Sequence, residues 1–426
     1  MQTRPYGLGN YRWQMLALLF FATTINYIDR QVIGILKPYI ATELGWNETD
    51  YGLIITAFQL AYAIGLLTTG RFLDRVGTRL GYIGAMIVWS LAAIAHAAAS
   101  GVRSFMIVRF LLGLGESANF PAAVKSVAEW FPRKDRAFAT GWFNSGSTVG
   151  AILAPVLVSA ITVSLGWRMA FVVTGAIGFI WLALWWRWYQ HPAIHKKITR
   201  SEYEYIHQDE ASENSNTSLS WWHLFRYKQT FAICATRFVS DWVWWFFLFW
   251  IPDFIARTAQ VNIQQLVMPL IVIYLVSSLG GIGGGWLSSH FLRQGRSIDF
   301  ARKRTILWSA LLVLPVMLVP HIGNFWILVL LIALAAAGHQ SWASNIFTLV
   351  SDIYPKNAVA SMVGLSGFTG AIGGALSASF VGLILDATHS YFLIFTVASS
   401  VYLLNWLIIR VFIPEIKPLR VDLLAA

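Results

Sequence analysis

The chain has 426 residues, of which 57% are hydrophobic and only 12% are charged. A soluble protein of this length carries roughly twice that charged fraction, so the composition excludes an ordinary soluble domain. The net charge of +11 would suggest nucleic acid in a soluble protein, but here the distribution of Lys and Arg explains it better. A single cysteine excludes an internal disulfide, and no Cys/His spacing resembles a metal site, so neither a metal nor a cofactor is expected.

Apolar segments recur along the whole chain. Most reach the ~20 residues that a helix needs to cross the hydrocarbon, although the ninth is short. The twelve expected spans are residues 13–36, 51–70, 80–100, 104–124, 138–162, 167–189, 229–256, 264–291, 305–320, 324–349, 358–385 and 390–412. The first is not a cleaved signal, because it contains Asn26, Asp29 and Arg30 and lacks a small-residue cleavage site.

Lys and Arg gather on one side of the expected membrane. The N-terminus and alternate loops hold 24 of the 31 basic residues, and three more lie inside spans. The opposite loops hold only Lys37, Arg103, Arg168 and Arg257. The positive-inside rule then places both termini in the cytoplasm. If one span had been missed, all later loops would change sides, and the basic residues would be spread over both sides of the membrane. Their observed separation therefore favours twelve spans.

The only long polar stretch inside the chain separates two groups of six spans. We therefore expect a six-helix bundle at residues 1–189, a cytoplasmic linker at 190–228 and a second six-helix bundle at 229–426. A surface helix is expected within the linker, near residues 201–208.

Two motifs of the first half return in the second half. Residues 115–134 resemble 338–356, and residues 70–77 resemble 285–295. Both echoes occur in order at equivalent loops, which favours duplication over coincidence. Repeated six-span halves place a substrate site near the membrane midplane, between the halves.

Six charged side chains lie well inside the apolar spans, away from the span ends. They are Asp29, Arg30, Arg109, Glu116, Arg237 and Asp241. A charge at this depth costs roughly 2.5–3.5 kcal/mol on insertion scales, so such residues usually face a bundle interior or a watery cavity. They predict a pathway for a charged species. The alternative is a structural charge network that joins helices.

The loop after the second span resembles the cytoplasmic signature of the major facilitator superfamily. The residues that carry this likeness are Gly70, Asp74, Arg75, Gly77 and Arg79. In that superfamily the loop steadies the outward-open state. The resemblance implies an all-α membrane protein of the major facilitator fold, with 12 transmembrane helices in two pseudo-symmetric six-helix bundles.

Within the superfamily the chain resembles the anion:cation symporters. The likeness lies in residues 26–30, 109–121, 129–132 and 141–146. Spans seven and ten, from Asp241 and from His339 onward, are similar to those of hexuronate (glucuronate and galacturonate) transporters. The resemblance covers the chain apart from the linker and tails.

The resemblance also assigns charged residues. Sugar-acid relatives use an Asp-Arg pair in span one and an Arg and a Glu seven apart in span four. The corresponding residues here are Asp29, Arg30, Arg109 and Glu116. Galactonate transporters have Gln and Asn where this chain has Ser147 and Gly367, which argues against galactonate itself.

Arg30 and Arg109 are the candidate groups for the substrate carboxylate, because a guanidinium binds it bidentately and stays charged. Asp29 and Glu116 are the candidate proton carriers. Asp29 lies about 100° around the helix from Arg30, so it need not neutralise that arginine. Arg109 lies roughly 10 Å along the axis from Glu116, too far for an ion pair unless the side chains bend together. A substrate anion that competes for the arginine would let buried Glu116 accept a proton.

Neutral side chains complete the candidate site. The further candidate substrate contacts are Asn26, Tyr62, Asn144, Trp245, Gln340 and Asn345. Asn26 shares a helix face with Arg30, and an interhelical hydrogen bond is an equal alternative for it. Glycines in spans five and eleven are expected to let helices approach closely. They are Gly141, Gly146, Gly150, Gly364, Gly367, Gly370, Gly373 and Gly374.

Three polar residues of the second half carry open alternatives. Asp241 is either a functional charge or an N-terminal helix cap. Arg237 is expected to snorkel toward the cytoplasm. His339 takes the pseudo-symmetric position of Glu116, and it either titrates or forms a structural hydrogen bond.

These features predict a proton-coupled symporter that imports a sugar-acid anion, a hexuronate, by alternating access. Another organic anion such as galactonate, a proton-coupled drug antiporter and Na⁺ coupling are alternatives. The chain has no Walker loop and no catalytic grouping, so it is expected to be neither ATP-driven nor an enzyme. The expected partners are the anion, H⁺ and the lipid bilayer, without nucleic acid, for a monomer in the bacterial inner membrane.

Overall fold

The computed structural model describes residues 11–195, 197–208, 224–354 and 356–419. Within these ranges the chain forms helices joined by short turns and contains no β-strand. The all-α fold that hydropathy predicts is therefore confirmed for the described part of the chain.

The helices form two compact units. The first takes its described residues from Met1–Ile33 and Ala61–Asn216, and the second takes them from Gly34–Leu60 and Thr217–Ala426. Two long helices, α1 (Tyr11–Leu44) and α2 (Glu48–Val76), contribute to both units. The segment Gly34–Leu60 therefore folds with helices of the second half of the sequence.

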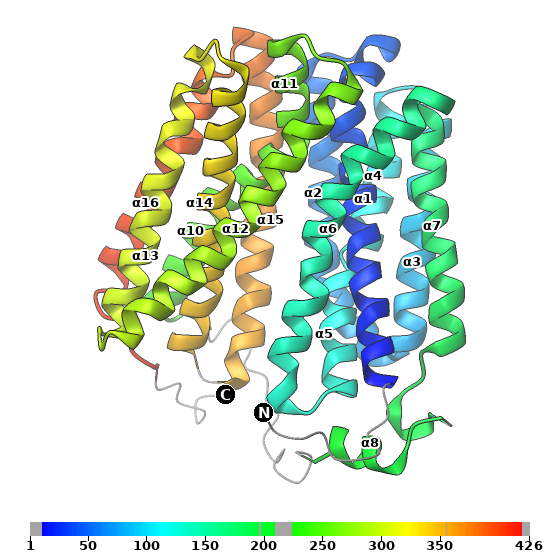
Figure 1. Ribbon diagram of the computed structural model, residues 1–426, viewed down its shortest axis with the longest axis vertical. Helices are drawn as coiled ribbons and strands as arrows, with labels where there is room; N and C mark the ends of the chain where they lie inside the picture. The colour runs from blue at the N-terminus through cyan, green and yellow to red at the C-terminus, as the bar shows by residue number, and fades with distance from the viewer. Residues whose placement is uncertain (1–10, 196, 209–223, 355, 420–426) are drawn as a thin grey trace. The chain divides into compact units, whose positions relative to one another are not determined.

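The first unit continues from α2 through the helices that precede residue 209 (Figure 1). They are α3 (Thr78–Ala95), α4 (Val102–Glu116), α5 (Asn119–Trp130), α6 (Arg133–Leu165), α7 (Trp167–Trp188) and α8 (Arg200–Ile206), with 3₁₀ turns at His96–Ala98 and Pro192–Ile194. Helix α3 packs against α4 and α7, and α6 packs against α5 and α7. Helix α8 confirms the helix expected in the linker, and it is tied down by Glu202, which accepts a hydrogen bond from the backbone N of Arg12 at 3.1 Å. Residues 209–223 of the expected linker lie outside the described ranges.

The second unit holds the helices that follow the linker (Figure 1). They are α10 (Lys228–Phe249), α11 (Ile251–Ala259), α12 (Ile263–Arg293), α13 (Ile298–Val313), α14 (Phe325–Ile353), α15 (Lys356–Thr388) and α16 (Phe392–Phe412), with a 3₁₀ segment at Leu314–His321. The most extensive helix contacts join α12 to α14 and α10 to α15.

Ten helices of the described chain are long and apolar enough to cross a membrane. The other two expected spans correspond to α1 and α4. Helix α1 is 34 residues long, but Asp29, Arg30 and Lys37 lower its hydropathy. Helix α4 has only 15 residues, because the chain turns at Ser117 and Ala118 before α5 begins.

Proline interrupts two of the expected spans. Span seven divides at Trp250 into α10 and α11, whose second residue is Pro252. Span nine ends as the 3₁₀ segment Leu314–His321, which contains Pro315 and Pro320. A proline has no N–H to donate and clashes with the preceding turn, which favours a break in the helix at these two places.

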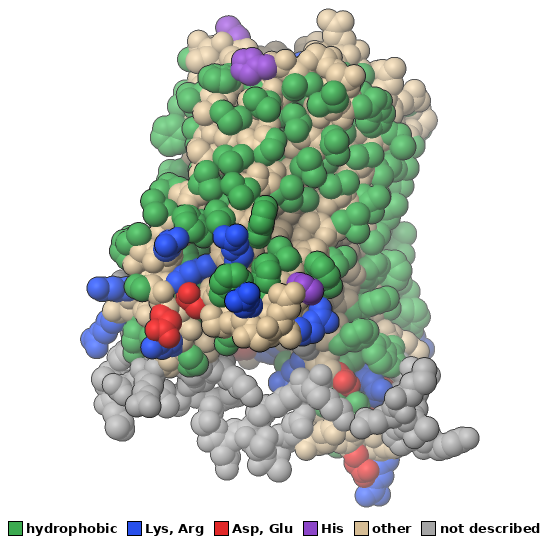
Figure 2. Space-filling view, turned by 60° about the vertical axis from the view of Figure 1, so that its left-hand side comes forward, with side chains coloured by type: hydrophobic (Ala, Val, Ile, Leu, Met, Phe, Trp, Pro, Cys, Tyr) green, Lys and Arg blue, Asp and Glu red, His purple; other side chains and the backbone are tan. Residues whose placement is uncertain are grey.

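The outer surface is apolar over most of its height. Leu275, Leu279 and Ile282 of α12 lie at helical spacing and are 49%, 59% and 71% exposed. Figure 2 shows such side chains covering one face, with Lys and Arg side chains gathered near one end. An exposed apolar belt of this kind suits contact with lipid tails.

Candidate functional site

The first unit buries an ion pair that joins α1 to α4. Arg30 Nε donates to Glu116 Oε2 at 2.8 Å. The arginine is 3% exposed and the glutamate 0%. Two charges in such a place are stabilised only by close pairing and further hydrogen bonds, so the surroundings of the pair decide what it can do.

Arg30 is held on several sides by side chains of α1 and α2. Asn26, one turn earlier on α1, accepts a hydrogen bond from Arg30 Nη2 at 3.0 Å. The Tyr27 and Tyr62 rings each lie 4.9 Å from the guanidinium carbon, a distance typical of cation–π contacts. Asn26 therefore bonds within its own helix rather than between helices, and Tyr62 contacts the arginine through its ring.

The second arginine contacts the backbone of the first. Arg109 is completely buried, and its Nη1 donates to the carbonyl oxygen of Arg30 at 3.4 Å. Its charge also acts on Asp29 and Glu116. Both arginines that the sequence singles out therefore lie in one buried cluster of the first unit.

Asp29 faces a different helix from Arg30, as the helical geometry predicts. Its Oδ2 accepts a hydrogen bond from the indole Nε1 of Trp89 on α3 at 2.8 Å. A Cβ added at Gly115 would lie 2.7 Å from the Trp89 Cβ, so α4 passes close to α3 just before Glu116.

Glu116, Asp29 and Asn26 each have one polar atom without a hydrogen-bond partner among the described residues. These atoms are Glu116 Oε1, Asp29 Oδ1 and Asn26 Nδ2, and all three are buried. Such atoms are costly in a native structure unless a proton, a ligand or water satisfies them. Either carboxylate, Asp29 or Glu116, therefore has an oxygen atom that can bind a proton.

In the second unit, Arg237 and Asp241 form an ion pair within α10. Arg237 Nη2 lies 2.7 Å from Asp241 Oδ2 on the same helix. The N-cap alternative for Asp241 is wrong, because α10 begins at Lys228 and Asp241 lies in its interior. The expectation that Arg237 snorkels is also wrong, since its guanidinium bonds Asp241 and lies 4.9 Å from the Phe347 ring.

His339 forms a hydrogen bond within an aromatic cluster. Its Nδ1 lies 2.6 Å from the Tyr402 hydroxyl, and its ring stacks on Trp244 at 5.4 Å. This arrangement matches the structural alternative for His339. Asn345 is buried and donates to the Ser341 carbonyl at 2.9 Å, whereas its Oδ1 has no partner among the described residues.

The remaining neutral candidates lie on three different helices. Asn144 is exposed on α6, and Gln340 is half-buried on α14. Trp245 is half-buried on α10 and stacks on Phe249 at 5.9 Å.

The expected glycine contacts form at five of the eight positions. An added Cβ would press on α1 at Gly146 and Gly150, and on α10 at Gly370, Gly373 and Gly374. Gly141, Gly364 and Gly367 face open space, so the expectation of close helix approach is wrong there.

The signature loop lies at the end of the first unit where α2 meets α5. Asp74 Oδ1 accepts from Lys125 Nζ at 2.6 Å, and Arg79 Nη2 donates to the Trp186 carbonyl at 2.7 Å. Gly77 has a φ of +85°, a conformation that favours glycine and lets α3 start at the next residue. Gly70 and Arg75 are exposed.

The second unit contains a buried ion cluster that the sequence did not reveal. Lys37 Nζ donates to Glu48 Oε2 at 2.5 Å and to Asp253 Oδ2 at 2.6 Å. Arg257 lies 2.6 Å from Glu48 Oε1 and 3.0 Å from Asp253 Oδ1. The Tyr391 hydroxyl donates to Asp253 Oδ2 at 3.2 Å.

Helix packing surrounds this ion cluster. The Asp386 carboxylate accepts from the backbone N of Glu48 at 3.0 Å and of Thr49 at 2.7 Å, which caps the start of α2. The Tyr51 hydroxyl donates to the Phe249 carbonyl at 2.9 Å. Lys37 was expected in a loop, but α1 continues to Leu44 and buries it. A lysine seven residues after Arg30, two turns along one helix face, was the available signal.

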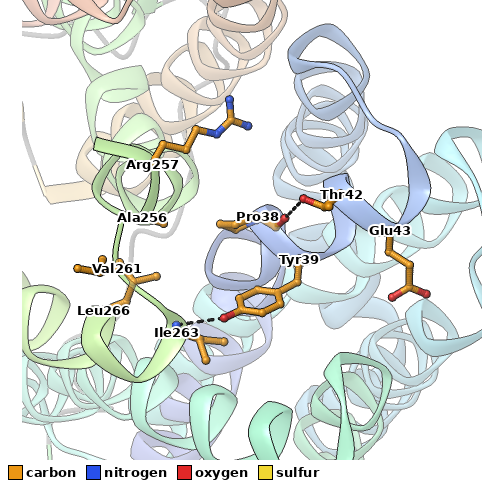
Figure 3. Close-up of a pocket in the computed structure, with 9 residues that line it drawn as sticks. All are labelled: Pro38, Tyr39, Thr42, Glu43, Ala256, Arg257, Val261, Ile263 and Leu266. Atoms are coloured by element: carbon orange, nitrogen blue, oxygen red, sulfur yellow. Dashed lines mark hydrogen bonds between the residues drawn. The ribbon is translucent and has the colours of Figure 1, made fainter. Parts of the chain in front are cut away.

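A cavity of about 470 Å³ lies beside the ion cluster. Figure 3 shows Tyr39 of α1 reaching the backbone N of Ile263, with Arg257 on the α11 side and Glu43 on the α1 side. The residues that line the cavity include none of the predicted substrate contacts.

The membrane-spanning helices and the buried charges together define a polytopic transporter. A family model described as Major Facilitator Superfamily matches residues 19–298 and 294–425. The chain belongs to this superfamily, and it is a transporter rather than an enzyme.

Relatives agree with the resemblance inferred from the motifs. The chain is 32% identical over 402 residues to the hexuronate transporter of Escherichia coli (strain K12), covering 93% of each chain. It is 32% identical to the galacturonate transporter of Dickeya chrysanthemi, covering 72% of this chain and 91% of that one. It is 30% identical to a D-galactonate transporter of Escherichia coli, covering 88% and 90%.

A solved structure confirms the fold. The bacterial homolog of the human lysosomal transporter Spinster, in an inward-facing and unoccupied conformation, superposes with a TM-score of 0.75 at 19% identity. The match covers 96% of this chain and 99% of that chain. The major facilitator fold that the signature loop implies is thus confirmed.

Proposed function

We propose that the protein is a proton-coupled symporter that imports a sugar-acid anion, a hexuronate such as glucuronate or galacturonate, by alternating access. The observation that carries this proposal is the buried Arg30–Glu116 pair, in which a permanent cation is neutralised by an acid that can itself become neutral. If Glu116 takes up a proton and becomes neutral, a substrate anion can replace it beside Arg30.

The substrate carboxylate takes the place of Glu116 at Arg30. The guanidinium offers two parallel N–H donors to a carboxylate, and Asn26, Tyr27 and Tyr62 fix its plane. Arg109, which contacts the Arg30 backbone, adds a second positive charge close to the bound anion. Two buried arginines favour an anion over a neutral or cationic substrate.

The proton goes to Glu116. Once the substrate holds Arg30, Glu116 would be a buried carboxylate without its counter-charge, and taking up a proton on Oε1 removes that cost. Substrate and proton therefore bind together and leave together. Asp29 is the second candidate carrier, since its Oδ1 also has no partner among the described residues.

Alternating access requires a closure that forms and breaks. The ion cluster of Lys37, Glu48, Asp253 and Arg257 joins the first-half segment Gly34–Leu60 to second-half helices. We propose that this cluster closes the pathway at the end where α1 meets α2, and that it separates when that end opens.

The substrate class is inferred from relatives. The hexuronate, galacturonate and D-galactonate transporters are all named for sugar acids, and each is at least 30% identical to this chain. A carboxylate carried by a polyhydroxy chain or ring is therefore the best candidate. An aldonate such as galactonate, or another organic anion, is the second choice. A drug antiporter fits less well, because its cavity would favour acidic rather than guanidinium side chains.

The bacterial relatives support a location in the bacterial inner membrane. The distribution of Lys and Arg supports an orientation with both termini in the cytoplasm. The signature loop with Asp74 and Lys125 then lies on the cytoplasmic side, and the ion cluster of Lys37 lies on the outer side.

Uptake into proteoliposomes tests the proposal. Labelled glucuronate, galacturonate and galactonate are offered under an imposed inward proton gradient, with and without Na⁺. We expect accumulation of a hexuronate that a protonophore abolishes and that does not need Na⁺. Equal uptake with no gradient, or no uptake of any sugar acid, would contradict the proposal.

A further inference from the structure

Two arginines at one end of the second unit are exposed and lack a carboxylate partner within the described ranges. Arg304 of α13 and Arg410 of α16 both reach the surface, and neither forms an ion pair with a described residue. The neighbouring Arg302 differs, because its Nε lies 2.7 Å from an oxygen of Asp352. Two permanent positive charges therefore face outward without compensation from the described chain.

Adjoining helix ends carry these two arginines. Lys303 Nζ donates to the Pro414 carbonyl oxygen at 2.6 Å, and the backbone N of Ile416 donates to Asp299 Oδ1 at 3.1 Å. These bonds tie the start of α13 to the segment that directly follows α16, and the two helices pack against each other (Figure 1). The two arginines therefore lie at the same end of the second unit, on neighbouring helices that run in opposite directions.

Each arginine lies over a tryptophan. The Arg304 guanidinium carbon is 5.9 Å from the Trp308 ring centre, and the Arg410 guanidinium carbon is 5.2 Å from the Trp406 ring centre. Trp308 follows its arginine by four residues, whereas Trp406 precedes its arginine by four. Because the helices run in opposite directions, both indoles lie about 6 Å farther from the joined helix ends than the arginines. The same order of groups on two helices indicates a layered surface.

Exposed leucines continue this surface beyond the indoles. Leu311 and Leu312 follow Trp308 on α13, Leu404 precedes Trp406 on α16, and all three leucines are exposed. Figure 2 brings this side of the molecule forward and shows Lys and Arg side chains gathered near its lower end, with hydrophobic side chains above them. The order from the helix ends is guanidinium, indole and aliphatic side chain. Phosphate, the polar interface and acyl chains follow one another in the same order in a lipid leaflet.

We infer that Arg304 and Arg410 bind the headgroup of an anionic phospholipid. A guanidinium presents paired N–H donors to phosphate oxygens and keeps its charge. The amphipathic indoles suit the boundary between headgroups and acyl chains, and the leucines contact the chains. A free phosphate ion would use only the guanidinium groups, so the whole surface fits a lipid better. The inference does not depend on which substrate the protein carries.

The inference predicts a preference for lipids with a net negative charge. Phosphatidylglycerol has such a charge, whereas the choline group of phosphatidylcholine compensates its phosphate. A basic residue near the membrane surface increases the affinity for an anionic lipid about fivefold, so removing both arginines should weaken binding about 30-fold. Binding of phosphatidylcholine should change much less.

Two double variants separate this site from general attraction by positive charge. The test variant is Arg304→Gln with Arg410→Gln. The matched control is Arg293→Gln with Arg296→Gln, which removes two exposed arginines from the turn between α12 and α13. The control removes the same charge without touching the layered surface. Thermal unfolding of both variants checks that these exposed substitutions leave the fold intact.

Native mass spectrometry of the full-length protein in detergent measures the affinity of the first lipid that binds. The probes are phosphatidylglycerol, phosphatidylcholine and glycerol 3-phosphate. We expect the wild type and the control to prefer phosphatidylglycerol, and the test variant to lose about 30-fold in its affinity. An equal loss in both variants, or no loss in the test variant, would overturn the inference. Equal affinity of the wild type for the two lipids, or glycerol 3-phosphate bound as tightly as phosphatidylglycerol, would overturn it as well.

Discussion

Replacing Lys37 by Met removes the central cation of the outer ion cluster. The cluster contains two cations, Lys37 and Arg257, and two carboxylates, Glu48 and Asp253, so its net charge is zero. After the substitution two carboxylates share one arginine, whose side chain is 51% exposed. Breaking a buried pair by removing one partner costs about 3–5 kcal/mol, because an uncompensated charge remains. The exposed arginine offsets part of this, so we expect the lower end of that range.

Hydrogen–deuterium exchange measures this loss. The backbone N–H groups of Glu48 and Thr49 bond to Asp386, so they exchange when the two segments separate. A loss of about 3 kcal/mol raises the open population on the order of 100-fold and speeds exchange by the same factor. Amides of α3, in the first unit, serve as the internal reference and should be unaffected.

A double variant provides the matched control. Lys37→Met with Asp253→Asn leaves Glu48 paired with Arg257 and restores a net charge of zero. We expect exchange to return most of the way to the wild-type rate, although the neutral pair is not as tight as the original cluster. Unchanged exchange in Lys37→Met, or faster exchange in the double variant than in the single one, would refute the electrostatic role of the cluster.

Three further substitutions test the rest of the site. Arg30→Lys keeps the positive charge but loses the planar guanidinium that binds a carboxylate through two N–H groups. In uptake assays, KM for the sugar acid should therefore rise about tenfold or more. An unchanged KM would mean that Arg30 does not hold the carboxylate. Trp89→Phe removes the hydrogen bond to Asp29 and should cost about 1.5–3 kcal/mol, seen as a lower unfolding temperature, whereas an unaltered temperature would show that this bond is dispensable. Lys125→Met breaks the pair with Asp74, whose side chain is 74% exposed, so stability should change by less than about 1 kcal/mol. If the signature loop controls conformational change, uptake by Lys125→Met should nevertheless fall, and full uptake would argue against that role.

The sequence predicts which segments form helices and which charged side chains lie inside them. It predicts less well which residues those charged side chains contact. Hydropathy locates the spans because burial in lipid needs long apolar helices. The 100° step between successive residues correctly predicts that Asp29 and Arg30 face different helices. The Arg30–Glu116 bond joins residues 86 positions apart, and a single sequence carries no signal for such a contact.

The errors have related causes. The aromatic-rich stretch that follows Asp241 makes a helix cap one alternative for this residue, whereas α10 begins at Lys228 and its Arg237, one turn before Asp241, binds the carboxylate. The first expected span ends at residue 36, which places Lys37 in a loop, and only the folded chain brings Asp253 to it.

Glu116→Gln in proteoliposomes tests the coupling of substrate to protons. The amide retains the size and polarity of the side chain but cannot take up a proton. We expect the variant to exchange labelled hexuronate across the membrane at equal concentrations, while an imposed proton gradient no longer drives accumulation. Uphill accumulation equal to that of the wild type would show that Glu116 does not carry the coupling proton.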